Sequence, residues 1–152
     1  MSKNILPLSF FSVLGMVLFI FSTKNNATPS TTNTTSTLSA TINGSLWTPI
    51  TVSGSFSSGL VQIVGSAGIS TFEVYITSTS PGTYQLNKSS KSMIAYIQIQ
   101  PRNTYSSTSG SIVVTSYSNN IMIGTFQGYC LNSVTTQDSV SVTNGAFSVY
   151  IH

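Results

Sequence analysis

The sequence predicts an all-β fold, an antiparallel β-sandwich or flattened barrel of about nine strands, preceded by an N-terminal signal or anchor helix. Two observations in residues 38–152 predict the sheet. No segment there shows helical periodicity, and short runs rich in β-branched and aromatic residues alternate with turn residues. Without helices there is no parallel crossover, so we expect these residues to form one domain of antiparallel strands.

The first 27 residues have the outline of an export signal. Lys3 lies in a short polar start, and the uninterrupted apolar stretch, residues 8–21, is shorter than the roughly 20 residues of a membrane-spanning helix. No small-x-small cleavage site is well formed, so residues 1–27 are either a cleaved signal peptide or an N-terminal membrane anchor. We therefore predict export to the periplasm, the cell surface or the extracellular space, with membrane contact only through this segment.

Residues 28–37 are predicted to be a linker. They consist almost entirely of Thr, Ser, Asn and Pro and show no apolar periodicity. Such a composition cannot bury enough apolar surface to offset the entropy lost on ordering. We expect a flexible stalk between the export segment and the domain.

Two Asn-Gly pairs predict tight hairpins in the domain. Asn43-Gly44 separates residues 38–42 from residues 46–52, and it is the strongest short hairpin signal in the sequence. Asn144-Gly145 lies between residues 139–143 and 146–151 and predicts a second hairpin. Further strands are expected over residues 60–64, 71–77, 82–86 and 93–100.

Three of these strands alternate between an apolar face and a wetter face, which is the pattern of a half-buried strand. The expected inner faces are those of Phe72, Val74 and Ile76, of Ala95, Ile97 and Ile99, and of Phe147, Val149 and Ile151.

The hairpin around which the domain is organised is predicted within residues 110–132. Its strands are residues 112–114 and 121–126, with residues 118–120 between them. The second strand is apolar on both sides, so we expect both of its faces to be covered. Gly124 and Gly128 would leave room for a large neighbouring side chain or a bulge. Cys130, the single cysteine, continues the Phe126 face and is expected to be a buried small hydrophobe.

Charge is scarce throughout the chain, since only 5% of the residues are charged. Beyond the export segment three basic residues, Lys88, Lys91 and Arg102, stand against Glu73 and Asp138, a net charge of +1. Binding to nucleic acid needs a basic stripe that neutralises several phosphates. The sequence therefore excludes nucleic acid as a partner.

The sequence also lacks a catalytic pattern. Glu73 and Asp138 are the only carboxylates, and nothing in the sequence brings them together for acid/base chemistry. His152 is the last residue, where a Ser-His-Asp arrangement would be poorly held. The spacing of His, Cys and carboxylates fits no metal site. We expect no enzyme activity, no metal and no cofactor.

A binding surface is the alternative to catalysis. Trp47, Tyr75, Tyr96 and Tyr150 could form an aromatic platform that stacks on sugar rings, because the tyrosines fall on the wetter faces of their strands. The competing interpretation is that the tyrosines cover the outer face of a sheet through cross-strand pairs and that Trp47 closes one end of the core.

Five short motifs occur in order along the domain: TINGSLW at residues 41–47, GTYQL at 82–86, GSIVVT at 110–115, IGTF at 123–126 and VTNGAF at 142–147. Together they resemble a family of small exported all-β domains of unknown function from the Bacteroides and Flavobacterium group, often lipid-anchored. The resemblance implies an envelope location and no known activity. The sequence departs from the family in having no lipid-attachment cysteine after the apolar segment.

One further pattern concerns modification. In that bacterial group Asp followed by Ser or Thr and a small apolar residue resembles an O-glycosylation signal, and Asp138-Ser139-Val140 fits it. The resemblance implies a glycosylation site at Ser139.

Two functional hypotheses follow from the sequence. The first is a non-catalytic structural or protein-interaction domain of the cell envelope, held outward by its stalk. The second is a carbohydrate-binding or adhesive module. The expected partner is thus an envelope protein or a glycan.

Overall fold

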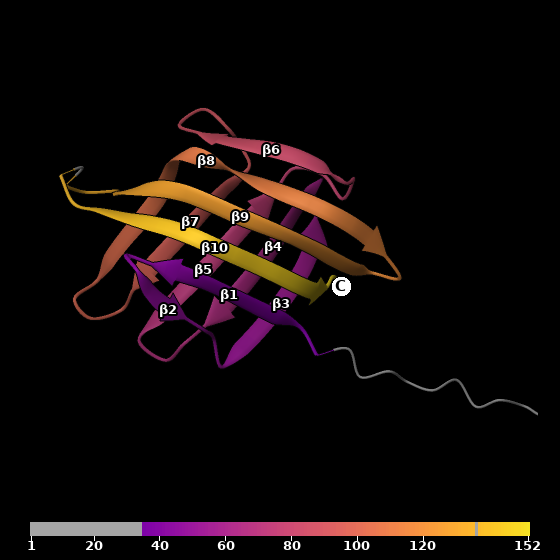
Figure 1. The fold of residues 1–152 in the computed structure, drawn as a ribbon, viewed down its shortest axis with the longest axis horizontal. Helices are drawn as coiled ribbons and strands as arrows, with labels where there is room; N and C mark the ends of the chain where they lie inside the picture. The colour runs from indigo at the N-terminus through magenta and orange to yellow at the C-terminus, as the bar shows by residue number, and fades with distance from the viewer. Residues whose placement is uncertain (1–34, 136) are drawn as a thin grey trace, which may run out of the picture. The chain divides into compact units, whose positions relative to one another are not determined.

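The computed structural model describes residues 35–135 and 137–152, and within these residues it contains strands and no helix (Figure 1). The all-β prediction is confirmed. The predicted export segment, residues 1–27, and most of the linker lie outside the described residues. The strands are β1 (Thr37–Ile42), β2 (Ser45–Trp47), β3 (Thr51–Ser57), β4 (Leu60–Ser66), β5 (Ser70–Ile76), β6 (Gly82–Asn87), β7 (Met93–Gln98), β8 (Asn103–Ser118), β9 (Ile121–Asn132) and β10 (Ser139–Tyr150).

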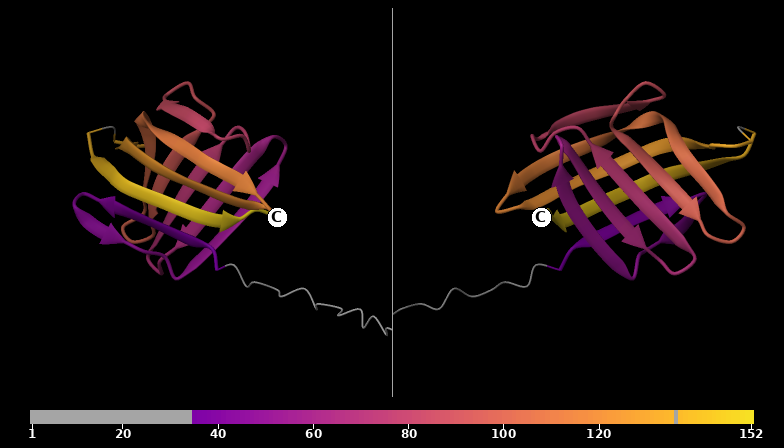
Figure 2. Two further views of the ribbon diagram at one scale, coloured as in Figure 1. Left: turned by 45° about the vertical axis from the view of Figure 1, so that its right-hand side comes forward. Right: turned by 180° about the vertical axis from the view of Figure 1, so that it is seen from behind.

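All ten strands belong to one antiparallel sheet in the order β2-β1-β10-β9-β8-β7-β5-β4-β3, with β6 paired only to β8. The sheet curls into a half-barrel of two layers, with β6, β8, β9, β10 and β1 in front of β7, β5, β4 and β3 (Figures 1 and 2). β8 joins the layers because it is 16 residues long: residues 103–106 pair with β7, and residues 109–114 pair with β6.

The C-terminus links the two layers at one corner. Gly54 in β3 forms an isolated parallel bridge with Ile151, just after β10. The backbone N–H of His152 donates to the Gly54 carbonyl at 3.2 Å, and that of Phe56 donates to the His152 carbonyl at 3.1 Å. The edge of β3 is therefore partly covered by the chain's own end.

Two tight hairpins form where the sequence predicts them. Asn43 and Gly44 connect β1 to β2 with φ of 49° and 82°. Asn119 and Asn120 connect β8 to β9 with φ of 51° and 61°, which confirms the central hairpin. Positive φ at both central residues is the mark of the type I′ turn, and its twist matches that of the strands that it joins.

The hairpin predicted at Asn144-Gly145 is wrong. Residues 139–150 form one continuous strand, β10, which pairs with β9 on both sides of a register shift between Val142 and Gly145. Only Asn144 has a positive φ, 51°, so the chain makes a bulge instead of reversing. Gly145 is needed there because an added Cβ would collide with the ring of Phe126.

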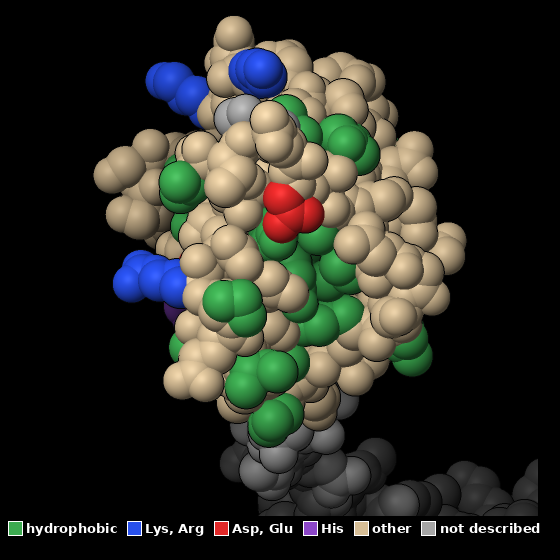
Figure 3. Space-filling view, turned by 90° about the vertical axis from the view of Figure 1, so that its left-hand side faces the viewer, with side chains coloured by type: hydrophobic (Ala, Val, Ile, Leu, Met, Phe, Trp, Pro, Cys, Tyr) green, Lys and Arg blue, Asp and Glu red, His purple; other side chains and the backbone are tan. Residues whose placement is uncertain are grey.

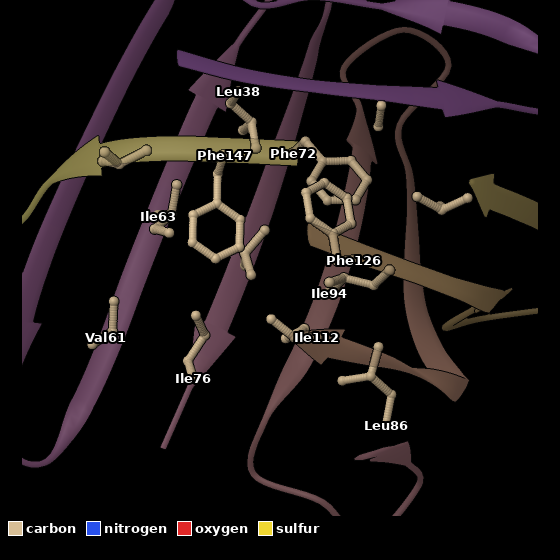
Figure 4. Packing of buried hydrophobic residues seen from close by; sticks show 14 of the residues in the cluster. Leu38, Val61, Ile63, Phe72, Ile76, Leu86, Ile94, Ile112, Phe126 and Phe147 are labelled. Atoms are coloured by element: carbon tan, nitrogen blue, oxygen red, sulfur yellow. The ribbon is translucent and has the colours of Figure 1, made fainter. Parts of the chain in front are cut away.

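A stack of aromatic rings fills the core between the layers (Figure 4). The rings of Phe72 and Phe126 stack with centroids 5.1 Å apart, and Phe126 and Phe147 follow at 6.4 Å. Gly124 makes the space for this stack, because a Cβ there would collide with the Phe147 ring, as the sequence predicts. The inner faces of β5 and of the end of β10 are confirmed as well, since Phe72, Val74, Ile76, Phe147, Val149 and Ile151 are at most 3% exposed.

Two predicted faces are wrong. β9 lies inside the sheet, but only its inner side is covered, and Ile123 on the other side is 43% exposed. On β7 the side chains that pack against the core cluster are Ile94 and Tyr96. Of the predicted face, Ala95 is 4% exposed, but Ile97 is only partly buried and Ile99 lies beyond the strand end and is 50% exposed. Alternation shows that a strand has two faces, but it does not show which face the rest of the chain covers.

The described residues contain no helix with the length and apolar character that crossing a membrane requires.

Candidate functional site

Trp47, the centre of the predicted aromatic platform, belongs to the core. It ends β2, is 9% exposed, and lies with its ring centroid 5.7 Å from that of Phe72. Its Nε1–H donates to the hydroxyl of Ser70, which is itself buried, at 2.9 Å. This single polar contact fixes the indole and joins β2 to the start of β5.

The three predicted tyrosines lie in three different places. Tyr96 packs against the core, with its ring centroid 6.4 Å from Phe72 and 6.1 Å from Tyr105. Tyr75 lies on the outer face of β5, while Tyr150 lies at the far end of β10, where its ring meets that of His152 edge-on at 4.8 Å. The structure therefore does not bring the four predicted side chains to one surface.

Glu73 and Asp138, the only carboxylates described, lie apart and each accepts a hydrogen bond from a tyrosine. The Tyr75 hydroxyl donates to Glu73 at 2.7 Å, and the Tyr105 hydroxyl donates to Asp138 at 2.6 Å. Burial and then the bond to Glu73 raise the pKa of Tyr75 from 10.0 to about 12. The bond to Asp138, and then burial, raise the pKa of Tyr105 above 10.0.

The sheet order places β7, β8 and β9 between the strand of Glu73 and the strand that follows Asp138. A two-carboxylate site would need the two groups to flank one reacting bond. No group of three or more His, Cys, Asp or Glu side chains in the described ranges is arranged to hold a metal ion.

Ser139, the predicted modification site, begins β10. Its hydroxyl accepts a hydrogen bond from the hydroxyl of Tyr129 at 2.7 Å. Cys130 is 0% exposed, as the sequence predicts, and burial raises the pKa of its thiol from 9.0 to about 12.

Four exposed apolar side chains gather around the turn between β4 and β5, and we call them the apolar end. They are Leu46, Ile50, Ile69 and Ile99, which are 75%, 82%, 73% and 50% exposed. Figure 3 shows the face that is turned to the left in Figure 1, where hydrophobic side chains, a class that includes the aromatic ones, gather below an acidic one.

Backbone and side-chain hydrogen bonds hold the apolar end together. The N–H of Ile50 donates to the Ser66 carbonyl at 2.8 Å, and the N–H of Ile99 donates to the Ile69 carbonyl at 2.9 Å. The Trp47–Ser70 bond ties the backbone of β2 to the start of β5, and the Leu46 side chain lies on the opposite face of β2 from Trp47. Three segments far apart in the sequence thus present their apolar side chains around one turn.

Sequence reasoning missed the apolar end, although a signal was present. Ile50, Ile69 and Ile99 each lie next to or near a turn residue, namely Pro49, Gly68 and Pro101. A turn usually runs over the surface, so a large aliphatic residue in a turn does not serve the buried face of a strand. An apolar residue at such a position is a candidate for a contact surface.

The comparisons with known proteins identify a family and nothing further. The model of a family described as a domain of unknown function, DUF6252, matches residues 34–149. No curated protein and no solved structure matches the chain significantly.

Proposed function

We propose that the chain, which belongs to the DUF6252 family of domains of unknown function, is an exported, non-catalytic domain of the cell envelope that binds a protein partner. This family membership agrees with the motifs that the sequence shares with a family of unknown function. Export stays a prediction from the sequence, and the origin in the Bacteroides and Flavobacterium group stays what the resemblance implies; the sequence has no lipid-attachment cysteine after its apolar segment.

The observation that carries the proposal is the apolar end. Single exposed aliphatic residues are ordinary, but several of them on segments that hydrogen bonds hold around one turn are a candidate contact surface. Completely burying an aliphatic side chain of this size contributes roughly 1.5–3 kcal/mol. Ile50 and Ile69, which are 82% and 73% exposed, would gain most of that free energy on contact with a partner.

Charge defines the partner more closely. The four side chains of the apolar end are uncharged, and Arg102 lies in the same loop as Ile99. A matching surface is therefore apolar at its centre and carries an acidic side chain at the edge that faces Arg102, because the rim of an interface is the place for charge. An envelope protein with such a surface is the partner that we propose.

The absence of catalysis is part of the proposal. The separation of Glu73 from Asp138 supports it, and so does the engagement of each carboxylate by a tyrosine hydroxyl. The alternative of a carbohydrate-binding or adhesive module loses its predicted platform, since Trp47 and Tyr96 are part of the core.

Site-directed photo-cross-linking in the native cells tests the proposal. A photoreactive amino acid at position 50 of the full chain should cross-link to one envelope protein, and the same amino acid at position 134 should not. Val134 is the matched control because it is apolar, 87% exposed and located in the β9–β10 loop, which bonds to the start of β8 through the Ser133 N–H and the Thr104 carbonyl.

The cross-linked protein is then purified and titrated against variants of the chain. Ile50→Ser combined with Ile69→Ser should weaken binding by about 50-fold or more, whereas Val134→Ser should leave the dissociation constant unchanged. If the double variant binds as tightly as the wild type, or if positions 50 and 134 cross-link alike, the apolar end is not the binding surface.

Localisation is tested separately by fractionation. The full chain should be recovered with the envelope fraction, and its β domain should be accessible to protease added outside the cytoplasmic membrane. Recovery in the cytoplasmic fraction would contradict export even if the apolar end binds a partner.

A further inference from the structure

The outer face of β8, β9 and β10 carries two adjoining hollows that the proposed protein interaction does not use. The three strands lie side by side toward the viewer in Figure 1. One hollow of about 410 Å³ lies between Thr125, Gln127 and Asn144, and the next, of about 270 Å³, lies between Gln127, Tyr129 and Ser141. Gln127 lines both, so the two hollows form one groove along β9.

The bulge in β10 shapes this groove. Thr143 and Asn144 together occupy the place opposite Gln127, because the register shifts between Val142 and Gly145. Bulges re-aim side chains and are enriched next to binding and active sites. Here the bulge brings a second side-chain amide, that of Asn144, to the same groove as Gln127.

The groove is uncharged, and its lining combines amide and hydroxyl groups with apolar side chains such as Val113 and Ala146. None of the side chains that line either hollow is charged. Each amide offers both donors and an acceptor, and serine and threonine hydroxyls beside them can act in either role. Within the described residues the amides of Gln127 and Asn144 make no side-chain hydrogen bond, so both are available to a ligand.

An aromatic ring closes one end of the groove. Tyr129 is 45% exposed, and its hydroxyl is held by Ser139 at 2.7 Å. A tyrosine ring provides rigid contact area at low entropic cost, while neighbouring Ser and Asn side chains provide adaptable hydrogen bonds. A ligand that presents both an apolar ring face and several hydroxyls would satisfy this arrangement.

We propose that this groove binds a neutral oligosaccharide chain along β9. The span from Thr125 to Tyr129 is roughly 13 Å at the rise of a β-strand, which suits a short oligosaccharide better than a single sugar. A phosphorylated or acidic ligand would find no cation in the groove, and the core of a protein interface would leave its amides and hydroxyls without partners. Because the groove is uncharged and carries several side chains that can form hydrogen bonds, an uncharged glycan is the ligand that fits it best.

Native affinity electrophoresis of the full chain tests the proposal, in a nonionic detergent that carries no sugar. The gels contain neutral probes, namely mixed-linkage β-glucan, galactomannan and dextran, or polygalacturonate as an acidic probe. Retention of the chain by at least one neutral polymer is expected. Retention by none of the neutral probes, or only by polygalacturonate, would overturn the proposal.

Matched variants locate the site. Gln127→Ala and Tyr129→Ala should each weaken retention roughly tenfold or more, while Tyr129→Phe should keep most of it because the ring remains. The controls are Gln137→Ala, an exposed amide in the β9–β10 loop, and Tyr150→Ala, an exposed tyrosine at the other end of the outer face.

Circular dichroism and urea unfolding of each variant separate a lost contact from a lost fold. If Gln127→Ala and Tyr129→Ala are folded and are retained as strongly as the wild type, the groove is not the site. The outcome is independent of the apolar end, since the Ile50→Ser and Ile69→Ser changes should not affect retention.

Discussion

Replacing Trp47 with alanine is expected to lower the free energy of unfolding by about 3–5 kcal/mol, the range for deleting a buried aromatic side chain. The indole is 9% exposed and lies against Phe72, and its Nε1–H is bound by Ser70 at 2.9 Å. Its loss leaves both a cavity beside Phe72 and a buried Ser70 hydroxyl without its partner. Small domains are stable by only about 5–15 kcal/mol, so the variant would lose roughly a fifth or more of the total.

Trp47→Phe separates the two parts of this effect. Phenylalanine keeps most of the ring contact with Phe72 but cannot donate to Ser70, so a smaller loss of about 1–2 kcal/mol is expected. The assay is urea unfolding followed by far-UV circular dichroism, because Trp47 is the only tryptophan and its fluorescence disappears in both variants. The slope of free energy against urea should stay the same.

One result would refute this reasoning. If Trp47→Ala unfolds within about 1 kcal/mol of the wild type and at the same time loses retention by neutral polysaccharides, Trp47 is a ligand contact and not a core residue.

Two other predictions concern titrating groups. The pKa of Tyr75 is about 12 in the folded domain and 10.0 ordinarily. The unfolded chain therefore loses the Tyr75 proton first, and the stability of the domain should fall as the pH rises from 10 toward 12. Tyr75→Phe should reduce this fall, measured as urea midpoints across that pH range, and an unchanged fall would contradict the assignment to Tyr75. Cys130 is 0% exposed and its thiol pKa is about 12, so iodoacetamide near neutral pH should label it only as fast as the domain unfolds, and rapid labelling of the native protein would show that the thiol is accessible.

The sequence predicts the parts of the fold whose causes are local. Asn43-Gly44 and Asn119-Asn120 form tight turns because each pair supplies two residues that tolerate positive φ, whatever surrounds them. The alternation of Phe72, Val74 and Ile76 is likewise local, since it requires only that one face be buried.

The errors arise where the cause lies elsewhere in the chain. Asn144-Gly145 has the composition of a turn, yet β9 on one side and β1 on the other continue past it, and their pairing makes a bulge more favourable than a reversal. The outer side of β9 is apolar at Ile123, but among the described residues no element packs over it and it is 43% exposed. Which strands pair and which face another layer covers depend on the tertiary structure. The alternation of residues along one strand does not reveal them.

The groove along β9 was beyond sequence reasoning for a related reason. Gln127, Tyr129 and Asn144 meet because a bulge shifts the register of β10, and nothing in the sequence gives that register. Tyr96, by contrast, was placed on the wetter face by its neighbours, and its inward position follows from contact with Phe72 and Tyr105. The exposed ring at the proposed glycan site is that of Tyr129, which the alternation of apolar and polar residues did not identify.

The edges of the sheet bear on how the apolar end would bind a partner. An uncovered edge invites pairing with another chain, and proteins usually prevent this with charge, short strands or covering segments. This domain has little charge, but its edge strand β2 is only three residues long, and β3 is partly covered by the bridge to Ile151 and by the hydrogen bonds of His152.

Edges that are short or covered reduce non-specific association through the backbone. Leu46, Ile50, Ile69 and Ile99 have no such cover within the described residues, although the hydrogen bonds around residues 66–70 hold their segments in fixed positions. A rigidly held apolar surface costs little entropy when it binds, whereas a mobile one would have to be ordered first. A short edge strand at β2, a partly covered edge at β3 and an exposed apolar surface held by hydrogen bonds together favour a specific partner over non-specific association.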